Sequence, residues 1–125
     1  IIIPTFGSAR ISADAIKTSA GALFSVPICR SFNLKETIVF LKNSGLQIVA
    51  ASEKSSNYYY TINFTLPTTI ISGSEEKGVS NEYLKLSDIK VRIPQFGKID
   101  SLNVSIASGV IIYEAIRQRM IGSVV

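Results

Sequence analysis

A group of small polar residues lies where a loop runs into the longest predicted helix of this 125-residue chain. The loop covers residues 93–100, and Asp100, Ser101, Asn103 and Ser105 stand at its end. Because the first N–H groups of a helix lack partners within the helix, such a start offers donors to a polar ligand. Capping explains one Ser or Asp, but Asn103 and Ser105 have poor propensity for the helix interior in which we expect them. This helix start is therefore a candidate ligand site.

A second candidate is the loop at residues 73–78, which begins and ends with Gly and holds two Glu and one Lys. Glycine lets a backbone turn tightly and approach a ligand closely. The loop lacks the Lys and Ser or Thr of a phosphate-binding Walker loop, and it is not a dinucleotide fingerprint. Taken alone, it is more often an acidic surface turn than a site.

The absent residue types exclude several chemistries. Without histidine the chain can form no Ser-His-Asp or Cys-His triad. Cys29 is the single cysteine, so a zinc site is excluded and any metal would bind through oxygens. We expect no metal, and we expect Cys29 to be a buried, reduced thiol in a cytoplasmic protein.

Charge and hydropathy favour a soluble protein with a polyanionic partner. The formal net charge is +4, and the basic residues are spread along the chain. No apolar run approaches the about 18 residues that span a bilayer. The chain begins with three Ile and no Met, from which we expect it to be truncated at its N-terminus.

Apolar runs rich in β-branched residues alternate with stretches of helical spacing, which predicts an α/β fold with a parallel sheet flanked by helices. We expect a single domain over residues 1–125, because no linker or repeat interrupts the pattern. The predicted strands cover residues 1–3, 26–29, 46–51, 68–72 and 89–93, and the predicted helices cover 12–24, 33–43, 80–86 and 101–119.

The last predicted helix is apolar almost all round, so we expect it to be buried. Its small residues, Ala107, Ser108 and Gly109, would let another backbone come close. That backbone belongs either to the same domain or to a second subunit.

Residues 93–117 resemble the last signature motif of the SpoU family of RNA ribose 2′-O-methyltransferases, within the SPOUT superfamily. Residues 71–80 are similar to the middle motif of that family, at the family's spacing, although Glu76 replaces a frequent Gly. Residues 17–22 and 26–27 resemble the segment before it. The resemblance thus covers nearly the whole chain.

This resemblance implies a SPOUT-type domain with a C-terminal trefoil knot, which binds S-adenosylmethionine and pairs as a homodimer. Gly73, Ile93 and Leu102 match the positions that line the cofactor site. The implied reaction is transfer of a methyl group to a ribose 2′-hydroxyl of rRNA or tRNA, without a metal and without a membrane.

Glu75, Ser101 and Asn103 match the motif positions associated with catalysis and substrate placement. The family's first motif, which supplies a catalytic Arg, has no counterpart here, and Arg10 stands in the wrong context to replace it. We expect Ser101 and Asn103 to hydrogen-bond the ribose or that Arg, and we expect Glu75 to orient that Arg or a neighbouring Asn.

RNA contacts have several candidate residues. Lys54, Lys77, Lys98 and Arg10 could meet phosphates, although each is as readily an ordinary solvated residue. The run of Tyr at 58–60 is typical of packing at a half-buried position, and it could also stack on bases.

Two other functions remain open at this point. One is a catalytically inactive SPOUT-like domain that still binds cofactor or RNA. The other is an unrelated doubly wound domain that binds a different nucleotide and has no affinity for S-adenosylmethionine.

Overall fold

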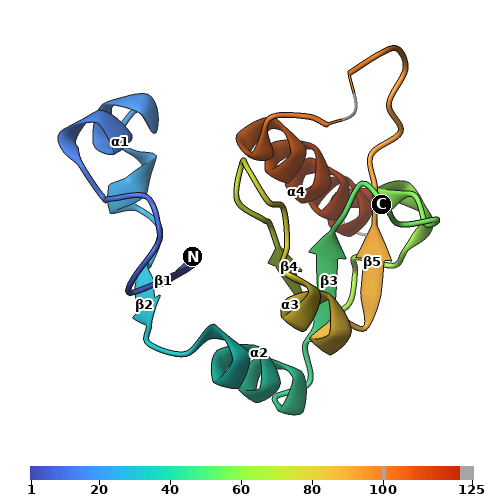
Figure 1. Cartoon of the computed structure of the whole chain (residues 1–125), viewed down its shortest axis with the longest axis horizontal. Coiled ribbons are helices and arrows are strands. Elements are labelled where there is room, and N and C mark those ends of the chain that lie inside the picture. The colour runs from blue at the N-terminus through green and yellow to red at the C-terminus, as the bar shows by residue number, and fades with distance from the viewer. Residues whose placement is uncertain (100, 122–125) are drawn as a thin grey trace. The chain divides into compact units, whose positions relative to one another are not determined.

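The predicted alternation of strands and helices is confirmed in the computed structural model, which describes residues 1–99 and 101–121 (Figure 1). The chain divides into two units, Ile1–Thr37 and Ile38–Val125. Helix α2, Leu34–Asn43, begins in the first unit and ends in the second. Whether the chain acts as one domain stays a prediction.

The first unit holds a two-stranded parallel sheet. Strand β1, Ile2–Pro4, pairs with β2, Cys29–Ser31, with Ile2 opposite Cys29. The predicted single sheet is therefore wrong in one respect, because the first two strands pair with each other in a sheet of their own. Strand β2 also begins at the residue where the predicted strand ends.

The helix predicted at 12–24 is interrupted. Ser12, the first residue of the predicted range, caps α1, Ala13–Thr18, by accepting a hydrogen bond from the N–H of Ala15 at 3.3 Å. Ala20 and Gly21 then adopt positive φ angles of 50° and 82°, which end a right-handed helix. A short 3-10 turn, η1, follows at Ala22–Phe24.

The prediction that Cys29 is buried is wrong, because its side chain is exposed. A sheet of two short strands has little interior to offer. Ser31 is the only buried residue among Ile1–Thr37, and its hydroxyl lies 2.7 Å from that of Thr37.

The second unit is built on a parallel sheet of strand order β4-β3-β5. Strand β3, Gln47–Ala51, lies between β4, Thr68–Ile71, and β5, Ile89–Val91. Ile48, Val49 and Ala50 are fully buried, which confirms the prediction of a strand covered on both faces. The other elements of this unit are η2 at Tyr59–Thr61, α3 at Asn81–Leu86 and α4 at Val104–Ile121.

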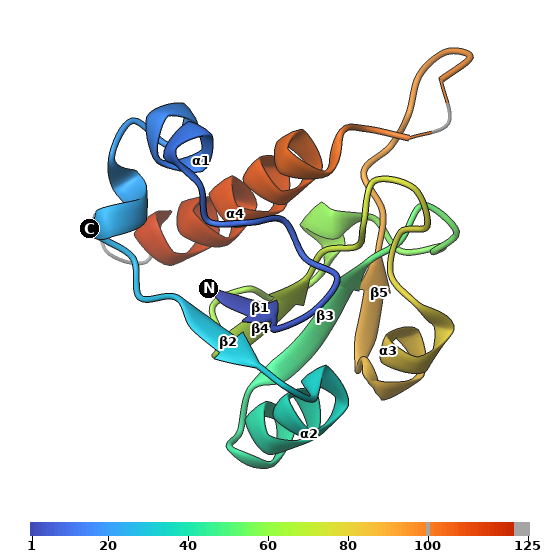
Figure 2. The ribbon, with the colours of Figure 1, turned by 60° about the vertical axis from the view of Figure 1, so that its left-hand side comes forward.

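Helix α4 packs on one face of this sheet and forms the core with it (Figure 2). Ile111 and Ala115 of α4 contact a cluster that includes Val49, Val91 and Phe64. Phe64 is fully buried, although it lies in the segment whose sequence shows the least regular pattern.

Within one chain, the predicted burial of α4 is confirmed on one side only. Only Ile111, Glu114 and Ala115 are buried, whereas the opposite side of the helix is exposed. The exposed apolar residues of α4 are Ile106, Ile112, Tyr113, Ile116, Met120 and Ile121. A sheet can cover one side of a helix, so an apolar composition all round does not by itself bury all of it within the chain.

Polar side chains of α4 hold the irregular segment that carries Phe64. The Gln118 side chain accepts a hydrogen bond from the Phe64 N–H at 2.7 Å and donates to the Ile62 carbonyl at 3.0 Å. Arg119 donates to the Phe64 carbonyl at 2.9 Å. Glu114 in turn accepts hydrogen bonds from Arg117 and Gln118 at 2.8 Å, so the whole group is satisfied internally.

Within residues 1–99 and 101–121, no helix combines the length and the apolar composition that crossing a membrane requires.

The buried Glu114 makes stability depend on pH. The hydrogen bonds from Arg117 lower the pKa of the Glu114 carboxyl below its ordinary value of 4.5, although burial opposes the shift. A lowered pKa in the folded state means that the stabilisation is present above pH 4.5 and is lost as the pH falls through the folded value. Glu114→Gln should lower the free energy of unfolding at pH 7 by about 1–3 kcal/mol.

Urea unfolding at pH 7 and below pH 4.5 checks this, because the variant should lose less stability on acidification than the wild type does. Glu76→Gln, at an exposed loop position, is the control and should change the free energy of unfolding by less than about 0.5 kcal/mol. Equal acid sensitivity of Glu114→Gln and wild type would contradict the assignment.

Candidate functional site

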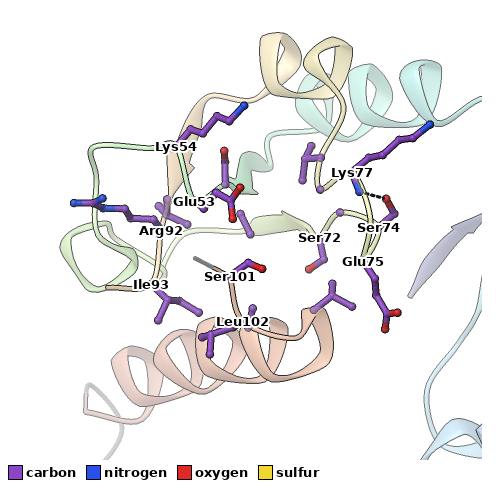
Figure 3. A pocket seen from close by; sticks show the side chains of 18 of the residues that line it. Glu53, Lys54, Ser72, Ser74, Glu75, Lys77, Arg92, Ile93, Ser101 and Leu102 are labelled. Atoms are coloured by element: carbon purple, nitrogen blue, oxygen red, sulfur yellow. Dashed lines mark hydrogen bonds between the residues drawn. The ribbon is translucent and has the colours of Figure 1, made fainter. Parts of the chain in front are cut away.

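A cavity of about 870 Å³ lies in the second unit, beyond the ends of its strands (Figure 3). Its walls come from the segments that follow β3, β4 and β5 and from the first turns of α4. The carboxyl ends of parallel strands meet at one edge of a sheet, where α/β proteins bind ligands. The volume lies in the range of about 300–1,000 Å³ that is usual for small-molecule sites.

All six residues that the motif resemblance assigns to the cofactor site or to catalysis line this cavity. They are Gly73, Glu75, Ile93, Ser101, Leu102 and Asn103. The structure thus brings together two motifs that lie about 20 residues apart in the chain. Their individual roles stay predictions.

The side chains of the six do not all point inward. The hydroxyl of Ser101 points toward the middle of the cavity, as does that of Ser72 (Figure 3). Glu75 lies at the edge, and its carboxylate is directed away from the middle (Figure 3). A ligand in the cavity would meet Ser101 more directly than Glu75.

The loop that begins at Gly73 is closed on itself. The N–H of Ser74 donates to the Gly78 carbonyl at 3.2 Å, and the N–H of Gly78 donates to the Ser74 carbonyl at 3.0 Å. A Cβ at Gly73 would lie 2.0 Å from the carbonyl carbon of Gly78 and 2.3 Å from the nitrogen of Val79. Glycine at position 73 is therefore required by this close approach of two backbones.

The departure at Glu76 does not strain this loop. Ala20 is the one non-glycine residue with a positive φ in the part of the chain that the structure describes, so Glu76 keeps an ordinary backbone angle. The turn is made at Gly78, whose φ is +65°.

The start of α4 corrects the sequence interpretation of Asn103. The helix begins at Val104 and not at residue 101, so Asn103 precedes it as the capping residue. Its side-chain oxygen accepts a hydrogen bond from the Ser105 N–H at 2.9 Å and also from the Ser105 hydroxyl, and its carbonyl accepts the Ala107 N–H at 2.9 Å. Capping thus explains Asn103, contrary to the argument from propensity. Asp100 lies outside the described residues.

Several residues of the cavity were missed from the sequence. They include Glu53 and Arg92, which with Glu75, Glu76 and the already noted Lys54 and Lys77 make three acidic and three basic side chains. The carboxylate of Glu53 points toward the middle of the cavity (Figure 3). The polar run after β3 was a usable signal, because it follows a buried strand just as the two recognised loops do.

A hydrogen bond joins the end of β4 to α4 beside the cavity, between the hydroxyls of Ser72 and Ser108 at 2.7 Å. Gly109, next along α4, has no atom of another described segment within 4 Å of the place of its Cβ. The close approach predicted for the small residues 107–109 is thus not made at Gly109 within the described part of the chain.

The four candidate phosphate contacts are scattered. Lys54 and Lys77 line the cavity, Lys98 lies in an exposed loop of the same unit, and Arg10 is exposed in the first unit. Among residues 1–99 and 101–121, no group of three or more His, Cys, Asp or Glu is placed to hold a metal ion.

The fold and the cavity define an α/β domain with a small-molecule site at the carboxyl ends of a parallel sheet. Residues 1–113 match the family model described as the SpoU rRNA Methylase family. Because the match covers most of the chain, the chain belongs to that family.

Relatives with assigned names are similar over nearly all of this chain. An uncharacterised tRNA/rRNA methyltransferase of Mycolicibacterium smegmatis is 40% identical over 119 residues, which are 95% of this chain and 38% of the relative. The 23S rRNA (guanosine-2′-O-)-methyltransferase RlmB of Photobacterium profundum is 35% identical over 121 residues, which are 97% of this chain and 49% of that protein. The chain thus spans half or less of the length of these relatives.

Solved structures share the fold. The SpoU methyltransferase AviRb of Streptomyces viridochromogenes, crystallised with AdoMet, superimposes with a TM-score of 0.86 at 30% identity, over 95% of this chain and 49% of AviRb. The TrmH/SpoU tRNA modifying enzyme of A. aeolicus superimposes with a TM-score of 0.83 at 33% identity, over 98% of this chain and 64% of that enzyme.

Substitution of Gly73 tests the closed loop. In Gly73→Ala the new Cβ would meet the backbone of Gly78 and Val79, so the loop must open and its paired hydrogen bonds must weaken. We expect faster amide hydrogen exchange at Ser74 and Gly78 and a loss of about 1–3 kcal/mol in the free energy of unfolding. Gly109→Ala is the matched control, because its Cβ would enter open space and alanine favours a helix. Unchanged exchange in Gly73→Ala would refute the close approach.

Proposed function

We propose that this chain carries the cofactor and ribose sites of an enzyme that transfers a methyl group from S-adenosylmethionine to a ribose 2′-hydroxyl of ribosomal or transfer RNA. The observation that carries this proposal is the meeting of all six motif residues in one cavity of about 870 Å³. Membership of the SpoU family and the names of the relatives support it.

The cavity suits S-adenosylmethionine in size and in charge. The cofactor carries a sulfonium, an ammonium and a carboxylate, and the cavity offers acidic and basic side chains in equal number. Gly73 presents a backbone with no side chain in the way, while Ile93 and Leu102 supply apolar surface for the adenosine. AviRb and a methyltransferase of Sinorhizobium meliloti, both similar in fold, were crystallised with AdoMet.

Methyl transfer requires the side chains mainly to position the reacting groups. When bound, S-adenosylmethionine supplies a methyl group on a sulfonium, so neither a metal nor histidine is needed. The residues of this chain must hold the 2′-oxygen in line with that methyl group and guide the leaving proton. Ser101 is suited to hold the ribose because its hydroxyl points into the cavity (Figure 3).

We assign Asn103 to the same placement and Glu75 to orienting a neighbouring group at the rim. The side-chain oxygen of Asn103 is engaged in capping, and its amide nitrogen makes no hydrogen bond within the described residues. That nitrogen is the atom available to a substrate oxygen. The outward direction of Glu75 fits a partner at the edge of the cavity better than direct contact with the methyl group (Figure 3).

A homodimer with a knotted C-terminal region completes the proposal. The exposed apolar side of α4 includes Ile106 at 57%, Tyr113 at 74% and Met120 at 56% exposure. Such a surface on a small protein is typical of an interface between subunits. Residues 73–80 line the same cavity as Gln95 and residues 101–103, as a knot that cradles the cofactor would require. We assign the protein to the cytoplasm, because a reducing compartment keeps an exposed thiol such as that of Cys29 reduced.

Calorimetric titration with S-adenosylmethionine and S-adenosylhomocysteine tests the cofactor site. We expect saturable binding of one molecule per chain, together with a sedimentation mass of two chains. The control is a second ligand, adenosine triphosphate, which should not bind. Gly109→Ala is not used as the control here, because Gly109 lies on α4, the helix proposed to form the subunit interface. A folded chain that binds neither cofactor form would overturn the proposal.

Substitution of Asn103 separates catalysis from capping. Asn103→Asp keeps an N-cap oxygen but removes the amide nitrogen, whereas Asn103→Ala removes both. In a protein that carries the family's first motif together with this chain, we expect both variants to lower transfer of labelled methyl from S-adenosylmethionine to unmodified 23S rRNA or tRNA by at least about tenfold, with cofactor affinity retained. Only Asn103→Ala should also lose about 1 kcal/mol of stability.

Full transfer by Asn103→Asp would restrict Asn103 to capping. If a wild-type protein that carries the first motif together with this chain binds cofactor and RNA but transfers no methyl group, the inactive binding domain is the correct description instead.

A further inference from the structure

A second cavity of about 440 Å³ adjoins the first and is not used by the proposed cofactor site. The two cavities share Glu53, Arg92, Ile93 and Gln95 as a common wall. The far side of the second cavity is formed by Tyr58 and Tyr60 and by the loop that carries Phe96 and Ile99.

The three tyrosines form a cluster of aromatic rings. The rings of Tyr58 and Tyr60 are stacked, with centroids 5.4 Å apart and an interplanar angle of 12°. The rings of Tyr59 and Tyr60 are nearly perpendicular, with centroids 5.2 Å apart, and Tyr59 packs against the core. Tyr60 therefore stands on a rigid support while half of its surface is exposed.

Arg92 is held against this cluster. Its guanidinium carbon lies 4.9 Å from the centre of the Tyr58 ring, and a terminal nitrogen donates to the Tyr58 hydroxyl at 3.1 Å. Its Nε is buried and has no hydrogen-bond partner among the described residues. A buried donor without a partner costs stability, so packing alone does not account for an arginine at this place.

The loop that lines this cavity together with the tyrosines exposes large apolar side chains. Phe96 is 95% exposed and Ile99 is 77% exposed, and Gly97 between them has a φ of +123° that turns the loop. Apolar side chains gathered beside a cavity indicate a surface that a ligand covers.

We propose that this second cavity holds a nucleobase of the RNA substrate, stacked on Tyr60 and covered by Phe96. The inference rests on the proposed function, because it places the base beside the cavity in which the ribose would be methylated. Aromatic side chains and arginine are the groups on which unpaired bases stack. The shared wall at Arg92 and Ile93 would let one nucleotide span the two cavities, with its ribose in the first and its base in the second.

Binding of short single-stranded RNA tests the proposal. The probe is fluorescein-labelled hexaadenylate, and an abasic hexamer of the same backbone is its partner. Both are titrated by fluorescence anisotropy at one fixed salt concentration, since backbone contacts depend on salt. We expect wild-type protein to bind hexaadenylate at least about fivefold more tightly than the abasic strand.

Substitutions locate the base. Tyr60→Ala and Phe96→Ala should each weaken hexaadenylate binding at least about fivefold and leave binding of the abasic strand unchanged, while Tyr60→Phe should restore wild-type affinity. Phe40→Ala is the matched control, because Phe40 is 68% exposed on α2 and lies outside both cavities. Phe96→Ala should leave the fold intact, since the removed ring is almost fully exposed, so a loss of binding in this variant would not result from misfolding.

The outcomes separate this inference from the proposed function. Equal affinity for the two strands, or an equal loss in Phe40→Ala, would overturn the base site while leaving cofactor binding intact. A loss of S-adenosylmethionine affinity in Tyr60→Ala and Phe96→Ala would assign the cavity to the cofactor and also overturn it. A chain that discriminates between the strands but binds no cofactor would retain the base site and lose the proposed function.

Discussion

Burial of β3 on both faces is the constraint on which the site depends. Val49 packs toward α4, while its neighbours Ile48 and Ala50 point to the opposite face, and all three are fully buried. A central strand fixed in this way aligns β4 and β5 in parallel register on its two sides. The carboxyl ends of the three strands then meet at one edge of the sheet. The loops that follow these strands therefore surround a common space.

Two local contacts turn that edge into a cavity. The backbone of Gly73 closes on Gly78, which keeps the loop after β4 narrow. The hydroxyl contact between Ser72 and Ser108 ties the same strand end to α4. Both contacts need small residues, and these residues lie in the two motif segments of the sequence. The segments that identify the site therefore also determine its shape. The chemical groups then come from loops, while the strands supply only position.

The sequence predicts those parts that depend on local pattern. The buried run of β3 and the short helix α3 follow from apolar content and spacing, and both are present. The first unit is less predictable, since positive φ at Ala20 broke a helix that apolar spacing favoured. Phe64 could not be assigned to the core, because it is held by Gln118 and Arg119 from a helix more than 50 residues away. Arg92 was missed for the same reason, because its partner Tyr58 is 34 residues distant.

The correction at Asn103 changes how the site and the fold are connected. A residue inside a helix could be exchanged with a modest local cost, but a capping residue fixes where the helix begins. Asn103 sets the first turn of α4, and Ser108 on the next turn holds β4. Ile111, one turn further, enters the core beside Val49. The cavity wall, the helix start and the core are therefore successive turns of one element. A shift of α4 along its axis would change all three together, so the packing that stabilises this unit also fixes the geometry of its site.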